Sequence, residues 1–230
     1  MIDVAAIIFD FDGVLIESEF EGNRHLARLL TGLGHPTSLA EAIEHYTGLS
    51  GRDFVETVEQ RIGRELPPEF HQATRSLRDQ SLRDGIAAVA GAIGFVRALP
   101  LELPKAVASS SSTRWVRAHL DHLGLTDMFE PHVYSGAEHV EQGKPAPDLY
   151  LHAARELGVD IARTVVIEDS NVGATGALAS GATVIGLAAG KHCLDGHGPM
   201  LHKTGVEYVA RSFDEVAKLL GLDQARRSPA

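Results

Sequence analysis

Short runs of apolar residues recur along the chain, and most of them end at a polar residue. Runs of this length that are apolar throughout are typical of strands buried on both faces of a parallel sheet, and they are too short for helices. The sequence therefore predicts up to six strands, the third and the sixth from the weakest patterns. They are expected at 4–9, 105–108, 132–135, 164–167, 182–187 and 208–210.

Helical patterns separate these runs. Val116, Leu120 and Leu123 repeat at helical spacing, and Leu149, Ala153 and Leu157 repeat in the same way after Pro147 and Asp148. Strands that alternate with amphipathic helices predict a doubly wound parallel sheet of the Rossmann-like type, with helices on both faces.

The alternation is interrupted once, between the first and the second predicted strand. Residues 17–85 contain no convincing strand but several helix-like segments, such as 23–33, 52–62 and one that follows Pro67-Pro68. A crossover between parallel strands needs only about a dozen residues. We therefore predict an α/β core of residues 1–16 and 86–222, a helical insert of residues 17–85, and a frayed polar tail at 223–230.

Composition and charge narrow the class of protein. The hydrophobic content is 44%, which is ordinary for a globular protein, and Cys193 is the only cysteine, so no internal disulfide can form. No stretch approaches the ~20 apolar residues of a membrane span, and the start lacks the basic region of a signal peptide. The formal net charge of −10 disfavours nucleic acid and anionic membranes as partners. These features predict a cytoplasmic location.

Polar residues follow the predicted strands at the points where ligands bind in open parallel sheets, outside the carboxyl ends. Asp10 and Asp12 follow the first strand, Ser109 the second, and Glu168-Asp169 the fourth, while Lys144 lies beyond the third. Taken singly, each has an ordinary structural explanation, such as a helix cap or a solvated loop lysine. Their order and their shared placement predict one site that gathers carboxylates, a hydroxyl and an ammonium group.

This mixture of groups suits phosphoryl transfer. Crowded carboxylates repel one another unless a cation neutralises them, and a ligand set made only of oxygens favours Mg²⁺. Mg²⁺ and Lys144 would attract a phosphoryl group, and Ser109 would donate a hydrogen bond to it. One carboxylate can then attack phosphorus while another transfers protons.

Four segments carry a specific resemblance to a known family. They are DFDGVLIES (10–18), VASSSS (107–112), GKPAPD (143–148) and VIEDSNVG (166–173), and ASGATVIGL (179–187) follows in the expected place. Together they resemble the haloacid dehalogenase superfamily of hydrolases, in the β-phosphoglucomutase-like branch that carries a helical cap after the first strand.

The resemblance implies a role for each matching residue. Asp10 corresponds to the nucleophile that forms an aspartyl-phosphate, and Asp12 to the general acid/base. The other matching residues fall into two groups. Ser109, Ser110 and Lys144 correspond to the phosphate-binding group, and Asp10, the Asp12 carbonyl, Glu168 and Asp169 to the Mg²⁺ ligands.

The resemblance leaves the reaction open among several classes. The dehalogenase branch uses neither a metal nor an acid at the position of Asp12, so dehalogenation is disfavoured. A sugar-phosphate mutase is a closer alternative, but such enzymes carry a histidine where this chain has Gly22. A non-catalytic binding protein would not require the whole set of residues. The sequence therefore predicts a phosphatase for a small phosphate ester, such as a sugar phosphate, a sugar-acid phosphate or phosphoglycolate.

Substrate contacts outside these motifs are predicted less sharply. Mutases also carry an arginine directly after a Gly-x-Ser turn, and here the turn at 48–50 is followed by Gly51 and then Arg52. Ser50 and Arg52 are the candidates for substrate contact from the insert.

Other polar and aromatic residues are predicted to have ordinary roles. The histidines show no metal-binding spacing, although three of them gather in the loop after the fifth strand. A structural or surface role is expected for Cys193, and packing in or beside the core for Trp115. The three loop histidines are His192, His197 and His202.

Overall fold

The computed structural model describes residues 4–49 and 51–222. Within them, six parallel strands form one sheet in the order β3-β2-β1-β4-β5-β6. The strands are β1 (Ala6–Phe9), β2 (Lys105–Ser109), β3 (Val133–Ser135), β4 (Thr164–Glu168), β5 (Thr183–Leu187) and β6 (Tyr208–Ala210). All six predicted strands are confirmed to within about two residues at each end, and so is the doubly wound parallel fold.

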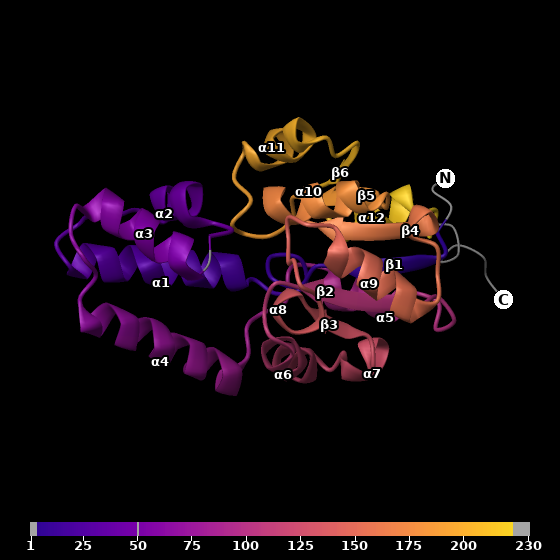
Figure 1. The fold of residues 1–230 in the computed structure, drawn as a ribbon, viewed down its shortest axis with the longest axis horizontal. Helices are drawn as coiled ribbons and strands as arrows, with labels where there is room; N and C mark the ends of the chain where they lie inside the picture. The colour runs from indigo at the N-terminus through magenta and orange to yellow at the C-terminus, as the bar shows by residue number, and fades with distance from the viewer. Residues whose placement is uncertain (1–3, 50, 223–230) are drawn as a thin grey trace.

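Helices cover both faces of this sheet, as Figure 1 shows. One layer contains α5 (Ala92–Ala98), α6 (Thr113–Leu123), α7 (Thr126–Phe129) and α12 (Phe213–Leu219). The other contains α9 (Asp148–Leu157), α10 (Asn171–Ser180) and α11 (His197–Thr204). Short α8 (Gly136–His139) follows β3, and the 3-10 helix η1 (Ile161–Arg163) precedes β4.

The alternation of side chains along the central strands explains why the sheet is buried on both sides. Ile7 and Phe9 of β1 enter the hydrophobic cluster beneath α5, α6 and α12, whereas Ile8 between them enters the cluster beneath α9 and α10. In β4, Ile167 likewise enters the first of these clusters and Val166 the second. Strands covered on both faces must be apolar at every position, and this requirement produces the uninterrupted apolar runs of the sequence.

Between β1 and α5, the described part of the chain forms four helices. They are α1 (Ser18–Gly32), α2 (Leu39–Tyr46), α3 (Gly51–Ile62) and α4 (Pro68–Asp84). Pro67 and Pro68 stand at the N-cap and the first position of α4, where proline's missing N–H costs no hydrogen bond. These helices share a separate hydrophobic cluster that includes Leu30, Tyr46 and Phe70.

The helical segment lies beyond the carboxyl ends of the strands (Figure 1). The chain enters it directly after β1 and returns through residues 85–87, where the Glu17 amide donates to the Ala87 carbonyl. The division into a core and a cap stays a prediction, and the tail at 223–230 lies outside the described residues. Among the residues that are described, no helix is both long and apolar enough to cross a membrane.

Candidate active site

The three central strands end side by side and bring polar residues from distant parts of the sequence together. Asp10 follows β1 directly, Ser109 ends β2, and Glu168 ends β4, with Asp169 as the next residue. Asp10, Ser109, Glu168 and Asp169 are all buried, at 7%, 0%, 0% and 2% exposure. Groups this deeply buried need partners, because burying an unpaired charge is costly.

Lys144 supplies the positive charge at the centre of this group. Its Nζ lies 2.5 Å from Asp10 Oδ1 and 2.7 Å from Glu168 Oε1, and its side chain is 4% exposed. Burial disfavours the charged ammonium, but Asp10 and Glu168 more than offset this, so the pKa of Lys144 is raised well above its usual value. Lys144 is therefore a fixed positive charge at the end of β1.

Glu168 is fully engaged by its neighbours. Oε1 accepts hydrogen bonds from Lys144 and from the buried Tyr150 hydroxyl, each at 2.7 Å. Oε2 accepts from the amide and the hydroxyl of Ser170, both at 3.0 Å. A Cβ at Gly173 would overlap this carboxylate, so the start of α10 can approach it only with glycine there. Glu168 thus holds Lys144 in place.

Asp12 has surroundings of a different kind. Its Oδ1 accepts hydrogen bonds from Ser18 Oγ at 2.8 Å and from Trp115 Nε1 at 3.1 Å. Its Oδ2 accepts from Ser111 Oγ at 2.7 Å and from Ser109 Oγ at 3.3 Å. These donors hold the carboxylate in one orientation without placing a cation beside it.

Trp115 connects Asp12 with the helical segment. The indole lies against His119 of the same helix, with ring centroids 4.1 Å apart and ring planes tilted by 44°. The Arg78 guanidinium of α4 lies over the indole, 5.3 Å from the ring centroid, in the arrangement of a cation–π contact. The donor that orients Asp12 is therefore itself contacted by a helix from beyond the sheet.

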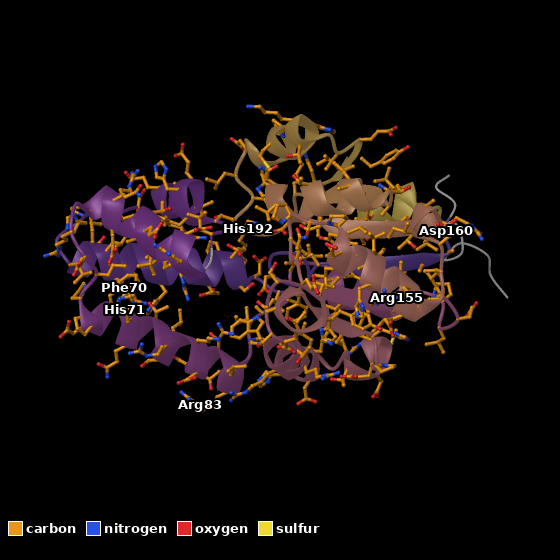
Figure 2. All side chains as sticks on the ribbon, in the orientation of Figure 1. Phe70, His71, Arg83, Arg155, Asp160 and His192 are labelled. Carbon is orange, nitrogen blue, oxygen red and sulfur yellow. The ribbon has the colours of Figure 1, made fainter. Side chains whose placement is uncertain are left out.

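Asp169 has one carboxylate oxygen without a hydrogen-bond partner among the described residues. This oxygen, Oδ1, is buried. Its Oδ2 lies 2.8 Å from His192 Nε2, and its backbone carbonyl lies 2.6 Å from His197 Nε2. His192 stands where the helical segment meets the sheet, as Figure 2 shows.

The carboxylates of Asp10, Glu168 and Asp169 fit a hard cation. Each offers an oxygen, these oxygens lie within 4.8 Å of one another, and all three residues are buried. Burial, followed by the charge of Glu168, raises the pKa values of Asp10 and Asp169 well above their usual range. A cation beside the free Oδ1 of Asp169 would offset the repulsion among the three negatively charged carboxylates. A ligand set made only of oxygens suits Mg²⁺. Glu168 already accepts four hydrogen bonds, so metal binding by Glu168 stays a prediction.

The turn after β1 requires a glycine. Gly13 has a φ of +81°, and a Cβ there would overlap the carboxylate of Asp169. Glycine adopts this conformation without steric cost, so the backbone after Asp12 can pass directly over Asp169.

Glu19, in the first turn of α1, adds another carboxylate to the site. Burial, then the charges of Asp169 and Asp12, raise its pKa to about 7. Sequence reasoning did not single out this residue, because a glutamate in the first turn of a helix is also an ordinary partner of the helix dipole.

Of the two candidates from the turn at 48–52, Arg52 faces solvent. The Arg52 side chain is 89% exposed and pairs with Glu56 at 2.5 Å, one helical turn further along α3. Ser50 lies outside the described residues. Ser110 is exposed next to Ser109 at the end of β2. Substrate contact by Arg52 and Ser50 and phosphate binding by Ser110 stay predictions.

Several contacts to the carboxylates of the site were not predicted from the sequence. Trp115 was expected to pack in or beside the core, yet its indole N–H faces Asp12. Ser111 reaches the same carboxylate, and His192 contacts Asp169. A helical spacing of apolar residues gives no sign that an indole N–H points at a carboxylate, so the pattern could not have found Trp115.

Comparisons with known proteins agree with this geometry. A sequence model of haloacid dehalogenase-like hydrolases matches residues 4–181. The fructose-1-phosphate phosphatase of Escherichia coli K12 is 30% identical over 182 residues, which are 77% of this chain and 93% of that protein. A haloacid dehalogenase-like protein from Agrobacterium tumefaciens superposes with a TM-score of 0.86 at 31% identity, over 97% of this chain and 100% of that one. A family hydrolase from Deinococcus radiodurans, solved with bound phosphate and sodium, has a TM-score of 0.82 at 31% identity, over the full length of both chains.

Proposed function

The chain belongs to the haloacid dehalogenase-like hydrolase family and is a phosphoric monoester hydrolase, and we propose that it hydrolyses a small phosphorylated sugar or sugar acid with the help of Mg²⁺. The reaction proceeds through an aspartyl-phosphate on Asp10. The observation that carries this proposal is the difference between Asp10 and Asp12. Asp10 lies beside the buried ammonium group of Lys144, whereas Asp12 accepts hydrogen bonds from neutral hydroxyl and indole groups.

Asp10 is the nucleophile in this proposal. Lys144 occupies Oδ1, so we assign the attack on phosphorus to Oδ2. The new bond joins Oδ2 to phosphorus, and the bond between phosphorus and the ester oxygen breaks. Ser109 at the end of β2 and Lys144 in the loop before α9 are placed to stabilise the charge that builds up on the phosphoryl oxygens.

Asp12 transfers the protons. In the first step it donates a proton to the departing alcohol, and in the second it removes a proton from the water that attacks the phosphorus of the aspartyl-phosphate. The second step releases phosphate and regenerates the Asp10 carboxylate. Ser18, Ser111 and Trp115 fix the orientation of Asp12, and general acid/base catalysis depends on that orientation.

Asp10, Asp169 and the backbone carbonyl of Asp12 would hold the metal ion, with Glu168 beside them. Bound there, Mg²⁺ would supply positive charge to the phosphoryl group and offset the repulsion among the carboxylates. The free, buried Oδ1 of Asp169 is the feature of the chain that supports this assignment.

Two features support a sugar-like substrate. The Escherichia coli relative is named for fructose 1-phosphate. In this chain, Glu19 brings a carboxylate from the insert beside Asp12 and Asp169, where it can accept hydrogen bonds from hydroxyl groups of a polyol. A mutase would also have to bind a second phosphate, and Arg52, the candidate for that task, faces solvent.

A phosphate-release screen tests the proposal. Purified protein is incubated with sugar phosphates, sugar-acid phosphates and phosphoglycolate, with Mg²⁺ or with EDTA. We expect release that requires Mg²⁺, strongest for a polyol phosphate, and none from Asp10→Asn. Absence of Mg²⁺-dependent release from every member of the panel would overturn the proposal, and conversion to an isomeric phosphate without release would favour a mutase.

A further inference from the structure

The loop after β5 brings three metal-binding side chains together beside the active site. His192 and Cys193 are adjacent in this loop, and His197 begins α11. One donor atom from each lies within 4.8 Å of the other two. Cys193 Sγ is 3.4 Å from His192 Nε2, and the two imidazole rings have centroids 5.3 Å apart.

The spacing of these atoms suits one metal ion. Zinc–sulfur bonds of ~2.3 Å and zinc–nitrogen bonds of ~2.0 Å at a tetrahedral angle place the two donors about 3.5 Å apart. The observed separation of 3.4 Å between Cys193 Sγ and His192 Nε2 matches this value. The third donor, on His197, lies within 4.8 Å of the other two.

The chemistry of the donors differs from that of the neighbouring carboxylates. A thiolate is a soft ligand and imidazole suits zinc, so this set selects zinc-like ions over Mg²⁺, whereas Asp10, Glu168 and Asp169 offer only hard oxygens. A site that prefers zinc-like ions thus lies beside a site that prefers Mg²⁺.

We propose that His192, Cys193 and His197 form a binding site for a soft divalent transition metal of the Zn²⁺ class, and that its occupation inhibits the enzyme. On binding, the Cys193 S–H bond breaks, a metal–sulfur bond forms, and the proton leaves to solvent. The inhibitory part rests on the function proposed above, and the binding part does not.

Inhibition follows from the contacts that the two imidazoles make with Asp169. His192 Nε2 lies 2.8 Å from Asp169 Oδ2, and His197 Nε2 lies 2.6 Å from the Asp169 carbonyl oxygen. Coordination of the metal through Nε2 removes the hydrogen that can be donated to Asp169. Asp169 then loses the partners that orient it, or becomes a ligand of the soft metal itself. Either change weakens its hold on Mg²⁺.

Metal binding is measured first, without reference to activity. Zn²⁺ competes with a chromophoric chelator in the presence of excess Mg²⁺, and Co²⁺ reports a thiolate ligand through a sulfur-to-cobalt charge-transfer band. The variants are Cys193→Ser and His197→Asn, with His202→Asn as the matched control, because exposed His202 lies in α11 and bonds only to Val206 among the contacts described.

The wild type and His202→Asn are expected to bind one Zn²⁺ per chain and to show the cobalt band. Cys193→Ser should lose the band, and both site variants should bind Zn²⁺ more weakly by at least roughly tenfold, since even the loss of a residue that only supports a ligand has that effect. Wild-type affinity in Cys193→Ser and His197→Asn, with folding confirmed by circular dichroism, would overturn the site.

The inhibitory part is tested with the same proteins. Zn²⁺ should inhibit the wild type over the concentrations that fill the site, while Cys193→Ser should keep its Mg²⁺-dependent activity and resist inhibition by roughly tenfold or more. Equal inhibition of both proteins would show that Zn²⁺ acts at the carboxylates and would contradict the inhibitory role. A protein without phosphatase activity that still shows the cobalt band would contradict the proposed function but support the metal site.

Discussion

At the scale of residues, the two aspartates of the site differ in what surrounds them. Asp10 is buried beside Lys144 and other carboxylates, and its pKa is raised by burial and by the charge of Glu168. Asp12 accepts hydrogen bonds from hydroxyls and an indole. Two carboxyl groups in such different environments can perform two different tasks in one reaction. The surroundings therefore favour attack by Asp10 and proton transfer by Asp12.

Replacing Asp12 by asparagine tests its role. The amide keeps the size of the side chain but cannot exchange protons, so turnover of an alkyl phosphate should fall by roughly 10²–10⁴. Hydrolysis of the aspartyl-phosphate should also slow, so the intermediate should accumulate. Steady-state phosphate release provides the measurement, and wild-type rates with a poor leaving group would show that another residue transfers the proton.

Trp115→Phe tests whether the indole N–H positions Asp12. Phenylalanine keeps an aromatic ring against His119 but removes the donor to Asp12 Oδ1. A hydrogen bond to a charged group corresponds to ~1.5–3 kcal/mol, so kcat for a poor leaving group should fall at least about tenfold. With 4-nitrophenyl phosphate, whose leaving group needs no proton, the first step should change little. Equal losses in the rate of this first step on both substrates, measured within a single turnover, would indicate general structural damage and contradict the positioning role.

At the scale of elements, the turn between β1 and α1 determines how closely the backbone passes the metal-binding carboxylates. Gly13 holds a positive φ above Asp169, and Asp12 and Ser18 stand on either side of it, joined by a hydrogen bond. The nucleophile, the acid/base and the entry to the helical segment thus share one short stretch of backbone. A change of conformation in this turn would affect all three.

Gly13→Ala should therefore damage both stability and activity. A non-glycine residue in this conformation costs ~1–3 kcal/mol, and the added Cβ would overlap Asp169. Urea denaturation and Mg²⁺-dependent turnover provide the measurements. Gly22→Ala is the control, because a Cβ there meets nothing within 4 Å on an exposed face of α1. Equal stability and activity in the two variants would show that the turn tolerates a side chain.

The sequence predicted the strands and helices better than it predicted the contacts that loops make with the site. Buried parallel strands require uninterrupted apolar residues, so the runs ending at Asp10, Ser109 and Glu168 revealed both the strands and the edge at which the site lies. The positions of Trp115 and His192 depend on how α6 and the loop after β5 fold back over that edge. Such packing leaves no periodic signal in the chain, and the contacts of these two residues with Asp12 and Asp169 were not predicted.

At the scale of the whole molecule, the site lies between the sheet and the helical segment, and several buried carboxylates meet there. The pKa values of Asp10, Asp169 and Glu19 are raised, Glu19 to about 7, with burial as the first cause in each case. The folded protein without metal then holds protons that the unfolded chain has released. Its stability should therefore fall as the pH rises from about 4 through the raised pKa values.

Mg²⁺ should reverse this loss. Because the cation replaces the protons, it should raise the melting temperature more at pH 8 than at pH 5. At a concentration a hundred times its Kd, the gain is ~2.7 kcal/mol, or roughly 5–10 °C for a domain of this size. Thermal unfolding followed by fluorescence, with MgCl₂ or EDTA across this pH range, gives the measurement. A shift of equal size at every pH would argue against a metal site among these carboxylates.

The central claim is that Asp10 carries the phosphoryl group during turnover. The most direct test is to quench the Mg²⁺-supplied enzyme with acid within a turnover and to locate the phosphoryl group by peptide mass spectrometry. We expect the phosphoryl group on Asp10 in the wild type and in greater amount in Asp12→Asn. We expect none when EDTA removes the metal, and none in Asp10→Asn. Phosphate release at the full rate from a protein that never carries a phosphoryl group on Asp10 would contradict the account.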